Sequence, residues 1–131
     1  PEAARGQKLN PSSDLWSLGV VFYELLTGHS PFHAANTVAT LRNIAESTPV
    51  TVGDVHSGLP KSVDVVLQKL LSKKQEGRYS STQELLVDLK ALREGKTLTA
   101  VEIIHVENQH EKRKTAVVRL PEKPELLLGR D

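Results

Sequence analysis

The sequence contains no cysteine, which excludes disulfide bridges, thiolate metal sites and cysteine nucleophiles. Methionine is also absent and the chain opens on proline, so we expect an internal fragment of a longer protein. No apolar run reaches the length of about 18 residues that suggests a membrane-spanning helix. The net charge of +1 gives no overall attraction to nucleic acid or to an acidic membrane surface. With 131 residues, one domain with an appendage is the expected organisation.

The longest apolar stretch runs from Leu15 to Leu26. The residues that interrupt it are Ser17, Gly19 and Glu24. A helix that is apolar on all sides is typically buried, so we expect a central helix wrapped by the rest of the domain. Side-chain oxygens at residues 12–14 can cap its first turn. Gly28 suits a left-handed C-terminal cap, and Pro31 prevents continuation of the helix.

Three further helices are expected around this one. The first extends from residue 36 or 37 to 46, and the second begins near Pro60 and carries an amphipathic stripe over residues 63–71. Lysines 69, 73 and 74 near the end of the second suit its dipole. The third begins at Ser80 or Ser81 and ends before Gly95, since both serines open capping boxes. Residues 1–13 predict a helical turn and a loop, and residues 47–59 an irregular loop.

Residues 96–131 differ from the rest in being rich in β-branched side chains. The runs TLTAVEIIHV and TAVVRL lack helical spacing and predict two or three strands. We therefore divide the chain into residues 1–95 and residues 96–131. The fold class is mainly α, with a short β-prone C-terminal tail.

Three short motifs carry a family resemblance. They are Pro1-Glu2, the run DLWSLGVVFYELLTG with Pro31-Phe32, and Arg78-Tyr79 followed by the ELL of residues 84–86. They resemble the end of the activation segment, the central helix of the large lobe, and the last helical motif of eukaryotic-type Ser/Thr protein kinases. The amino-acid sequences of these motifs are most similar to those of the bacterial members of the family. The resemblance implies the C-terminal part of a kinase large lobe over residues 1–95, followed by a tail or linker. The last six residues, 126–131, faintly resemble the first strands of a forkhead-associated domain, although a plain linker is the favoured reading.

The resemblance implies that the parent protein transfers the γ-phosphate of ATP, with magnesium, to Ser or Thr hydroxyls of protein substrates. The Gly-rich loop, the His-Arg-Asp loop and the Asp-Phe-Gly motif are absent from these 131 residues. We therefore expect no catalytic, cofactor-binding or metal residue in this chain, and no activity from it alone. One alternative is a pseudokinase that serves as a binding scaffold, and another is an unrelated helical interaction module. The resemblance implies a cytoplasmic kinase domain and leaves membrane attachment of the parent open.

Four residues have supporting roles that the resemblance implies. Asp14 matches the aspartate that holds the backbone of the catalytic loop, whereas without the resemblance it is a helix N-cap. Glu2 and Arg78 match an ion pair that anchors the end of the activation segment. Arginine suits this role because its planar fork binds a carboxylate with two hydrogen bonds. Trp16 is expected to pack nearby against Pro1.

Glu24 matches a position that contacts a basic substrate residue in some kinases. A glutamate in an apolar helix is costly unless it is exposed or paired, so we favour structural pairing over substrate contact at this position. The histidines have no spacing that suggests a metal site; they are His29, His33, His56, His105 and His110. The basic run of residues 112–114 has no aromatic neighbours and predicts a solvated turn rather than a nucleic-acid site.

Overall fold

The computed structural model describes residues 1–99, and residues 100–131 lie outside the described part. Within residues 1–99 the regular elements are all helical. The strands predicted in the tail fall almost entirely on residues outside this part, and none of residues 96–99 is in a strand. None of the helices in residues 1–99 is long and apolar enough to cross a membrane.

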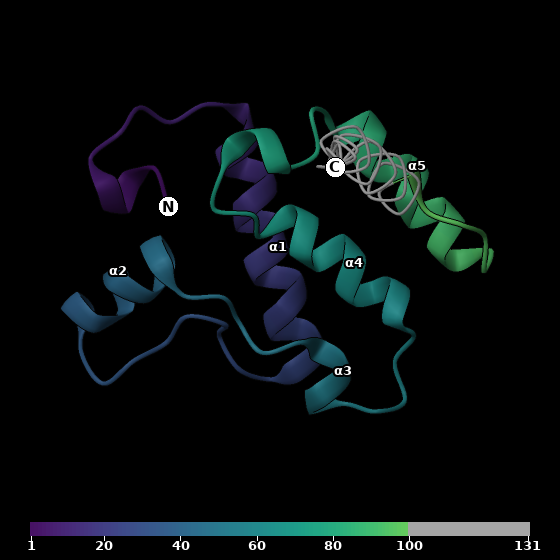
Figure 1. Cartoon of the computed structure of the whole chain (residues 1–131), viewed down its shortest axis with the longest axis horizontal. Helices are drawn as coiled ribbons and strands as arrows, with labels where there is room; N and C mark the ends of the chain where they lie inside the picture. The colour runs from purple at the N-terminus through teal and green to yellow at the C-terminus, as the bar shows by residue number, and fades with distance from the viewer. Residues whose placement is uncertain (100–131) are drawn as a thin grey trace, which may run out of the picture.

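The elements follow one another with short connections. In chain order they are η1 (Ala3–Arg5), α1 (Pro11–Thr27), α2 (Thr37–Glu46), α3 (Val52–Val55), α4 (Lys61–Leu70), η2 (Gln75–Gly77) and α5 (Thr82–Arg93). The long helix α1 runs down the centre of the view in Figure 1, with α4 packed along it and α5 beyond α4. The helix α2 lies on the other side, against η1. The mainly helical fold predicted from the sequence is confirmed.

Helix α1 begins earlier than the sequence suggested. Its N-cap is Asn10, whose side-chain oxygen accepts a hydrogen bond from the backbone N–H of Ser12 at 3.0 Å. Pro11 occupies the first helical position, where its fixed φ favours the helix and its missing N–H costs nothing. The cap expected within residues 12–14 is thus met in part: the N-cap is Asn10, and the Ser13 hydroxyl completes a capping box by accepting from the Asn10 N–H at 3.4 Å. The other end is as predicted: Gly28 has φ 76° and donates its N–H to the carbonyl of Glu24.

The short helix α3 was not predicted. Thr51 caps it, and the Asp64 carboxylate from α4 accepts hydrogen bonds from the N–H groups of Val52 and Gly53. Four residues cannot form a stable helix on their own, because nucleation is unfavourable. The tertiary contact with Asp64 stabilises this turn, and no local pattern in residues 47–59 reveals such a contact.

Two apolar clusters hold the helices together. The first joins α1, α4 and α5 and consists of Leu15, Val66, Leu70, Tyr79, Leu85 and Leu98. The second lies at the other end of α1 and consists of Tyr23, Phe32, Val52, Leu67 and Leu71. Helices α1 and α4 approach closely at Gly19, where an added Cβ would lie 2.8 Å from the Cβ of Leu70.

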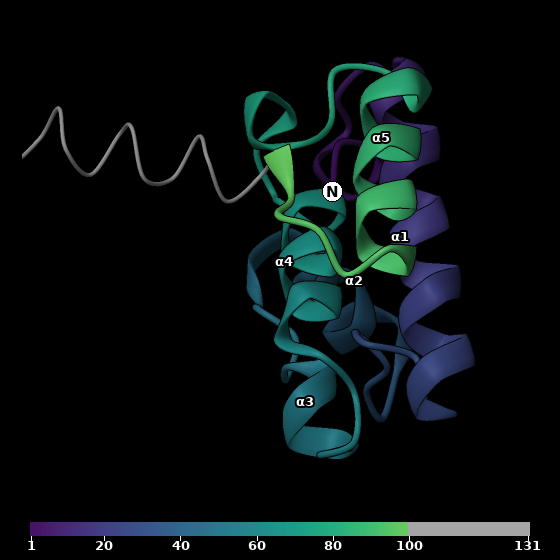
Figure 2. The same cartoon turned by 90° about the vertical axis from the view of Figure 1, so that its right-hand side faces the viewer.

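Within the described residues α1 is buried on one face only. Leu15, Gly19 and Tyr23 are buried, whereas Val21 is 51% exposed and Leu25 is 77% exposed. In Figure 2, α1 stands at the edge of the molecule, with α4 and α5 to one side. The all-round burial expected from its composition is therefore not met by residues 1–99, because no described element covers the face that bears Val21 and Leu25.

Candidate functional site

The centre of the candidate site is the guanidinium of Arg78, which lies just after η2. Its side chain has no exposed surface, and its N–H groups meet acceptors on separate segments. Nε donates to the Ser72 carbonyl at 2.8 Å, and Nη1 donates to the Ser12 carbonyl at 3.1 Å. Nη2 donates to Oε1 of Glu2 at 2.5 Å. Arg78 therefore ties the start of α1, the end of α4 and the N-terminal turn together.

The Glu2 carboxylate is buried with its partner and keeps its charge. Its second oxygen, Oε2, accepts a hydrogen bond from the Ser13 hydroxyl at 3.2 Å. Burial disfavours the charged form, but the hydrogen bond and charge of Arg78 outweigh it, so the pKa of Glu2 is lowered to about 2. The ion pair predicted between these two residues is confirmed as a contact.

A pair of stacked aromatic rings lies beside this ion pair. The ring of Trp16 stacks on that of Phe32, with centroids 5.4 Å apart and planes 11° from parallel. Trp16 also lines a cavity of about 180 Å³ together with Pro1 and Glu2. The indole N–H of Trp16 is buried and has no hydrogen-bond partner among the described residues. The predicted proximity of Trp16 and Pro1 is thus present in the structure.

Lys73 holds the C-terminus of α2, a role that the sequence did not indicate. Its ammonium lies 3.9 Å from the centroid of the Phe32 ring and donates to the carbonyls of Ile44 and Asn43 at 2.8 and 3.3 Å. Arg5 donates to the next carbonyl, that of Ala45. Cations suit this place because a helix C-terminus carries partial negative charge. Burial lowers the pKa of Lys73 to about 8, and the neighbouring charges of Arg5 and Arg78 act in the same direction.

The sequence assigned lysines 69, 73 and 74 to the dipole of the preceding helix. Helix α4 ends at Leu70, so Lys73 lies beyond its last turn and is free to reach α2. Lys69 pairs instead with Glu84 of α5 at 2.6 Å and lies over the Tyr79 ring at 4.3 Å. A lysine in the segment between two helices can contact either helix, and its position in the sequence does not show which one.

Asp14 and Glu24 stand apart from this network. Both are exposed on α1, and neither side chain makes a hydrogen bond or an ion pair within residues 1–99. Asp14 is the fourth residue of the helix, so it is not the N-cap. The spacing of Asp14, Leu18, Val21 and Leu25 places them along one stripe of α1. An acidic group thus lies at one end of this stripe, in which Leu18 packs against the first apolar cluster whereas Val21 and Leu25 are left exposed by the described residues.

A second buried polar group lies on α5. Asp88 is fully buried; its Oδ2 accepts from the Tyr79 hydroxyl at 2.9 Å, and its Oδ1 from the backbone N–H of Thr99 at 2.7 Å. Burial and the hydrogen bond to Asp88 raise the pKa of Tyr79. No local pattern predicts this network, because Asp88 looks like a surface residue of an amphipathic helix. Its effect is to fasten the residues that follow α5 onto that helix.

Within residues 1–99 no cluster of three histidine or acidic side chains is arranged to hold a metal ion. Residues 1–99 offer hydrogen-bond anchors and helix caps rather than a nucleophile with an adjacent base. What this arrangement does chemically is position backbone segments, above all the N-terminal turn against the start of α1.

Comparison with known proteins agrees with this geometry. The protein kinase domain family matches residues 1–89. The serine/threonine-protein kinase PknB of Mycobacterium tuberculosis is 35% identical over 104 residues, which is 79% of this chain. A probable serine/threonine-protein kinase PknB of Bifidobacterium longum is 35% identical over 89 residues, and that of Lactococcus lactis is 32% identical over 90 residues; each covers 68% of the chain. The chain belongs to the protein kinase domain family, and its relatives are bacterial Ser/Thr kinases.

The chain spans a small part of these relatives: 17% of the length of the mycobacterial protein, 13% of the Bifidobacterium protein and 14% of the Lactococcus protein. The family match over residues 1–89 covers the elements from η1 to most of α5. These matches support the fold class predicted from the sequence, and no finding favours an unrelated helical module.

Proposed function

We propose that this chain is the C-terminal part of the large lobe of a Ser/Thr protein kinase. The whole protein would transfer the γ-phosphate of ATP, with magnesium, to hydroxyls of protein substrates. The observation that carries the proposal is the buried Glu2–Arg78 pair, found where the family resemblance requires it although 76 positions separate the two residues. The alternative of a binding scaffold without catalysis has no observation in its favour.

In this proposal the Glu2–Arg78 pair fixes the end of the activation segment. A substrate-facing loop acts well only if its ends are held rigidly, because misplacement of reacting groups is costly. The pair is buried, charged and supported by Ser12 and Ser13, so it resists local opening. Trp16 contributes by packing beside it. None of these groups would touch ATP or substrate; they would position the segment that does.

Asp14 would act through a neighbouring segment of the parent protein. Its carboxylate is exposed and unused within the described residues, as expected of a group that accepts hydrogen bonds from a catalytic-loop backbone. The exposed side chains of Val21 and Leu25, on the same helix, would be covered by the same part of the lobe. Glu24, exposed on the same helix, would contact a basic residue of the substrate.

For the division of the chain, we propose that the catalytic domain occupies about residues 1–95 and that the remainder is a tail. The family match over residues 1–89 supports the first part. Leu98 is buried in the first apolar cluster, which favours a boundary a few residues later than the composition suggested. The strands proposed for the tail lie on residues outside the described part.

The test is a phosphorylation assay on the intact protein that contains this chain, with labelled ATP, magnesium and a generic protein substrate. We expect label on Ser and Thr of the substrate, and a large loss of kcat in the Asp14→Ala variant with little change in unfolding. The control is Glu24→Ala, which should alter KM for basic substrates and leave kcat nearly unchanged. Absence of transfer by the unmodified protein would favour the scaffold alternative.

A further inference from the structure

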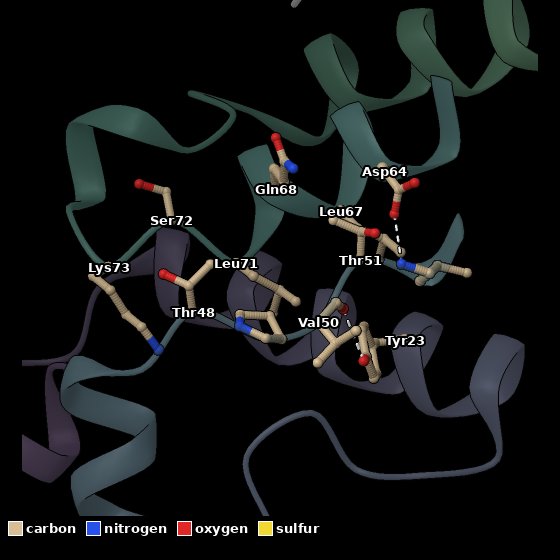
Figure 3. Close-up of a pocket in the computed structure, with 12 residues that line it drawn as sticks. Tyr23, Thr48, Val50, Thr51, Asp64, Leu67, Gln68, Leu71, Ser72 and Lys73 are labelled. Carbon is tan, nitrogen blue, oxygen red and sulfur yellow. Dashed lines mark hydrogen bonds between the residues drawn. The ribbon is translucent and has the colours of Figure 1, made fainter. Parts of the chain in front are cut away.

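A pocket distinct from the Glu2–Arg78 site opens between α1, α4 and the segment that joins α2 to α3. Its volume is about 430 Å³, within the range of roughly 300–1,000 Å³ typical of small-molecule sites. Figure 3 shows Leu67, Gln68 and Leu71 on one side, Thr48 and Val50 opposite, and Tyr23 at one end. Glu2, Arg78 and Trp16 do not line it, although Ser72 and Lys73, which contact that site, do.

The floor of the pocket is apolar and already ordered. Tyr23, Val52, Leu67 and Leu71 are all buried members of the second apolar cluster. The Tyr23 hydroxyl donates to the Val50 carbonyl at 2.9 Å, which holds the segment of residues 48–52 in place. Asp64 fixes the end of the same segment through the Val52 N–H at 2.6 Å. A preformed cavity of this kind binds a ligand without a large cost of ordering.

The charge around the pocket decides the class of ligand. Two charged side chains line it, Asp64 and Lys73. The Asp64 carboxylate is occupied by N–H groups of α3, and the Lys73 ammonium is directed to the carbonyls of α2 and the Phe32 ring. Neither charge is left for a ligand, so a charged molecule would lose its hydration without gaining a partner.

Neutral hydrogen-bonding groups do remain at the rim. The Thr48 hydroxyl and the Gln68 amide make no hydrogen bond within the described residues, and both are exposed. An apolar floor with a few polar groups at its edge is the usual composition of a small-molecule site. Such groups orient a ligand rather than supply most of its affinity.

We propose that this pocket binds an uncharged, largely apolar small molecule with one or two hydrogen-bonding groups, of about the size of a bicyclic aromatic. The site goes beyond the proposed kinase function, because it lies among residues that take no part in phosphoryl transfer there. A bound molecule would bridge α1, α4 and the segment before α3. It would therefore stabilise the attachment of α2 and α3 to the rest of the lobe.

The first test uses the full chain labelled with ¹⁵N and titrated with indole. We expect saturable shifts confined to the amides of Tyr23, Thr48, residues 50–52 and residues 64–73, and a rise in melting temperature with indole concentration. Indole-3-acetate, which adds a carboxylate, should bind at least about tenfold more weakly. Shifts that do not saturate, shifts spread over the whole surface, or equal binding of the two probes would overturn the proposal.

The second test closes the mouth of the pocket. Gln68→Trp places a large side chain at the rim from an exposed position of α4, so folding should be preserved. The matched control is Gln83→Trp, at an exposed position of α5 that does not line the pocket. We expect indole binding to fall at least about tenfold in the first variant and to persist in the second. Thr48→Trp should reproduce the loss from the opposite wall, and unchanged binding in both rim variants would refute the site.

Discussion

Arg78 and Glu2 form a buried ion pair in which Nη2 and Oε1 lie 2.5 Å apart, although 76 positions separate them. Removal of one partner would leave the other charged and desolvated, which costs about 3–5 kcal/mol. We therefore expect Arg78→Ala to lower the free energy of unfolding by about that amount in denaturant titration. Arg78→Lys should recover only part of it, because lysine cannot reproduce the fork that reaches Ser12, Ser72 and Glu2 together.

A control for this prediction is available on α2. Arg42 pairs with Glu46 at 3.2 Å, but both side chains are mostly exposed. Exposed pairs of this type contribute about 0–1 kcal/mol, so Arg42→Ala should change stability little. Equal losses in Arg42→Ala and Arg78→Ala would show that burial is not what gives the Glu2–Arg78 pair its importance.

The same pair predicts a dependence of stability on pH. The pKa of Glu2 is lowered from 4.5 to about 2 in the folded protein, since Arg78 outweighs the effect of burial. Its contribution is present above the unfolded pKa of 4.5 and is lost as the pH falls from there towards 2. We expect Glu2→Gln to flatten the stability curve in this window, measured by unfolding at several pH values. A curve of unchanged slope in the variant would contradict the assignment.

Much of the helical framework was predictable because it depends on local patterns. Spacing and capping preferences operate within a few residues. They account for the apolar stripe of α4, the N-cap of α2 at Asn36 and the C-cap of α1 at Gly28. The Glu2–Arg78 pair is different: no local rule brings those positions together, and only the family resemblance did. The planar guanidinium of arginine, which can donate two hydrogen bonds to a carboxylate, then explains why these two residue types suit a buried ion pair.

Four features were out of reach of local reasoning, each for a physical reason. The helix α3 depends on Asp64 from another helix, and the role of Lys73 depends on where α4 stops. The burial of Asp88 depends on Tyr79 and on Thr99, which the composition had assigned to the tail. The exposure of Val21 and Leu25 could not be predicted either, because the apolar composition of a helix does not show which of its faces other elements cover.

The lysine that caps α2 offers a further prediction. Lys73→Met keeps much of the apolar stem but removes the donors to the carbonyls of Asn43 and Ile44. Hydrogen bonds to charged groups contribute about 1.5–3 kcal/mol, so we expect a loss of that order and faster amide exchange in the last turn of α2. The control Lys74→Met, at an exposed neighbouring position, should leave exchange in α2 unchanged. Protection of α2 that survives Lys73→Met would mean that other contacts hold this helix.

The close approach of α1 and α4 makes Gly19 sensitive to the smallest substitution. In an isolated helix Gly→Ala is stabilising by about 1 kcal/mol, because alanine has the higher helix propensity. At Gly19 the new methyl group would lie 2.8 Å from Cβ of Leu70 and 3.1 Å from Cδ2 of Leu71. The Leu70 Cβ is attached directly to the backbone of α4 and cannot turn aside, so the two helices must separate. Overpacking of this kind costs about 1–3 kcal/mol, and we expect Gly19→Ala to be destabilising in thermal or denaturant unfolding. Ser17→Ala, on the exposed side of the same helix, provides the control and should be neutral or slightly stabilising. A Gly19→Ala protein as stable as the unmodified one would show that α4 can move without cost.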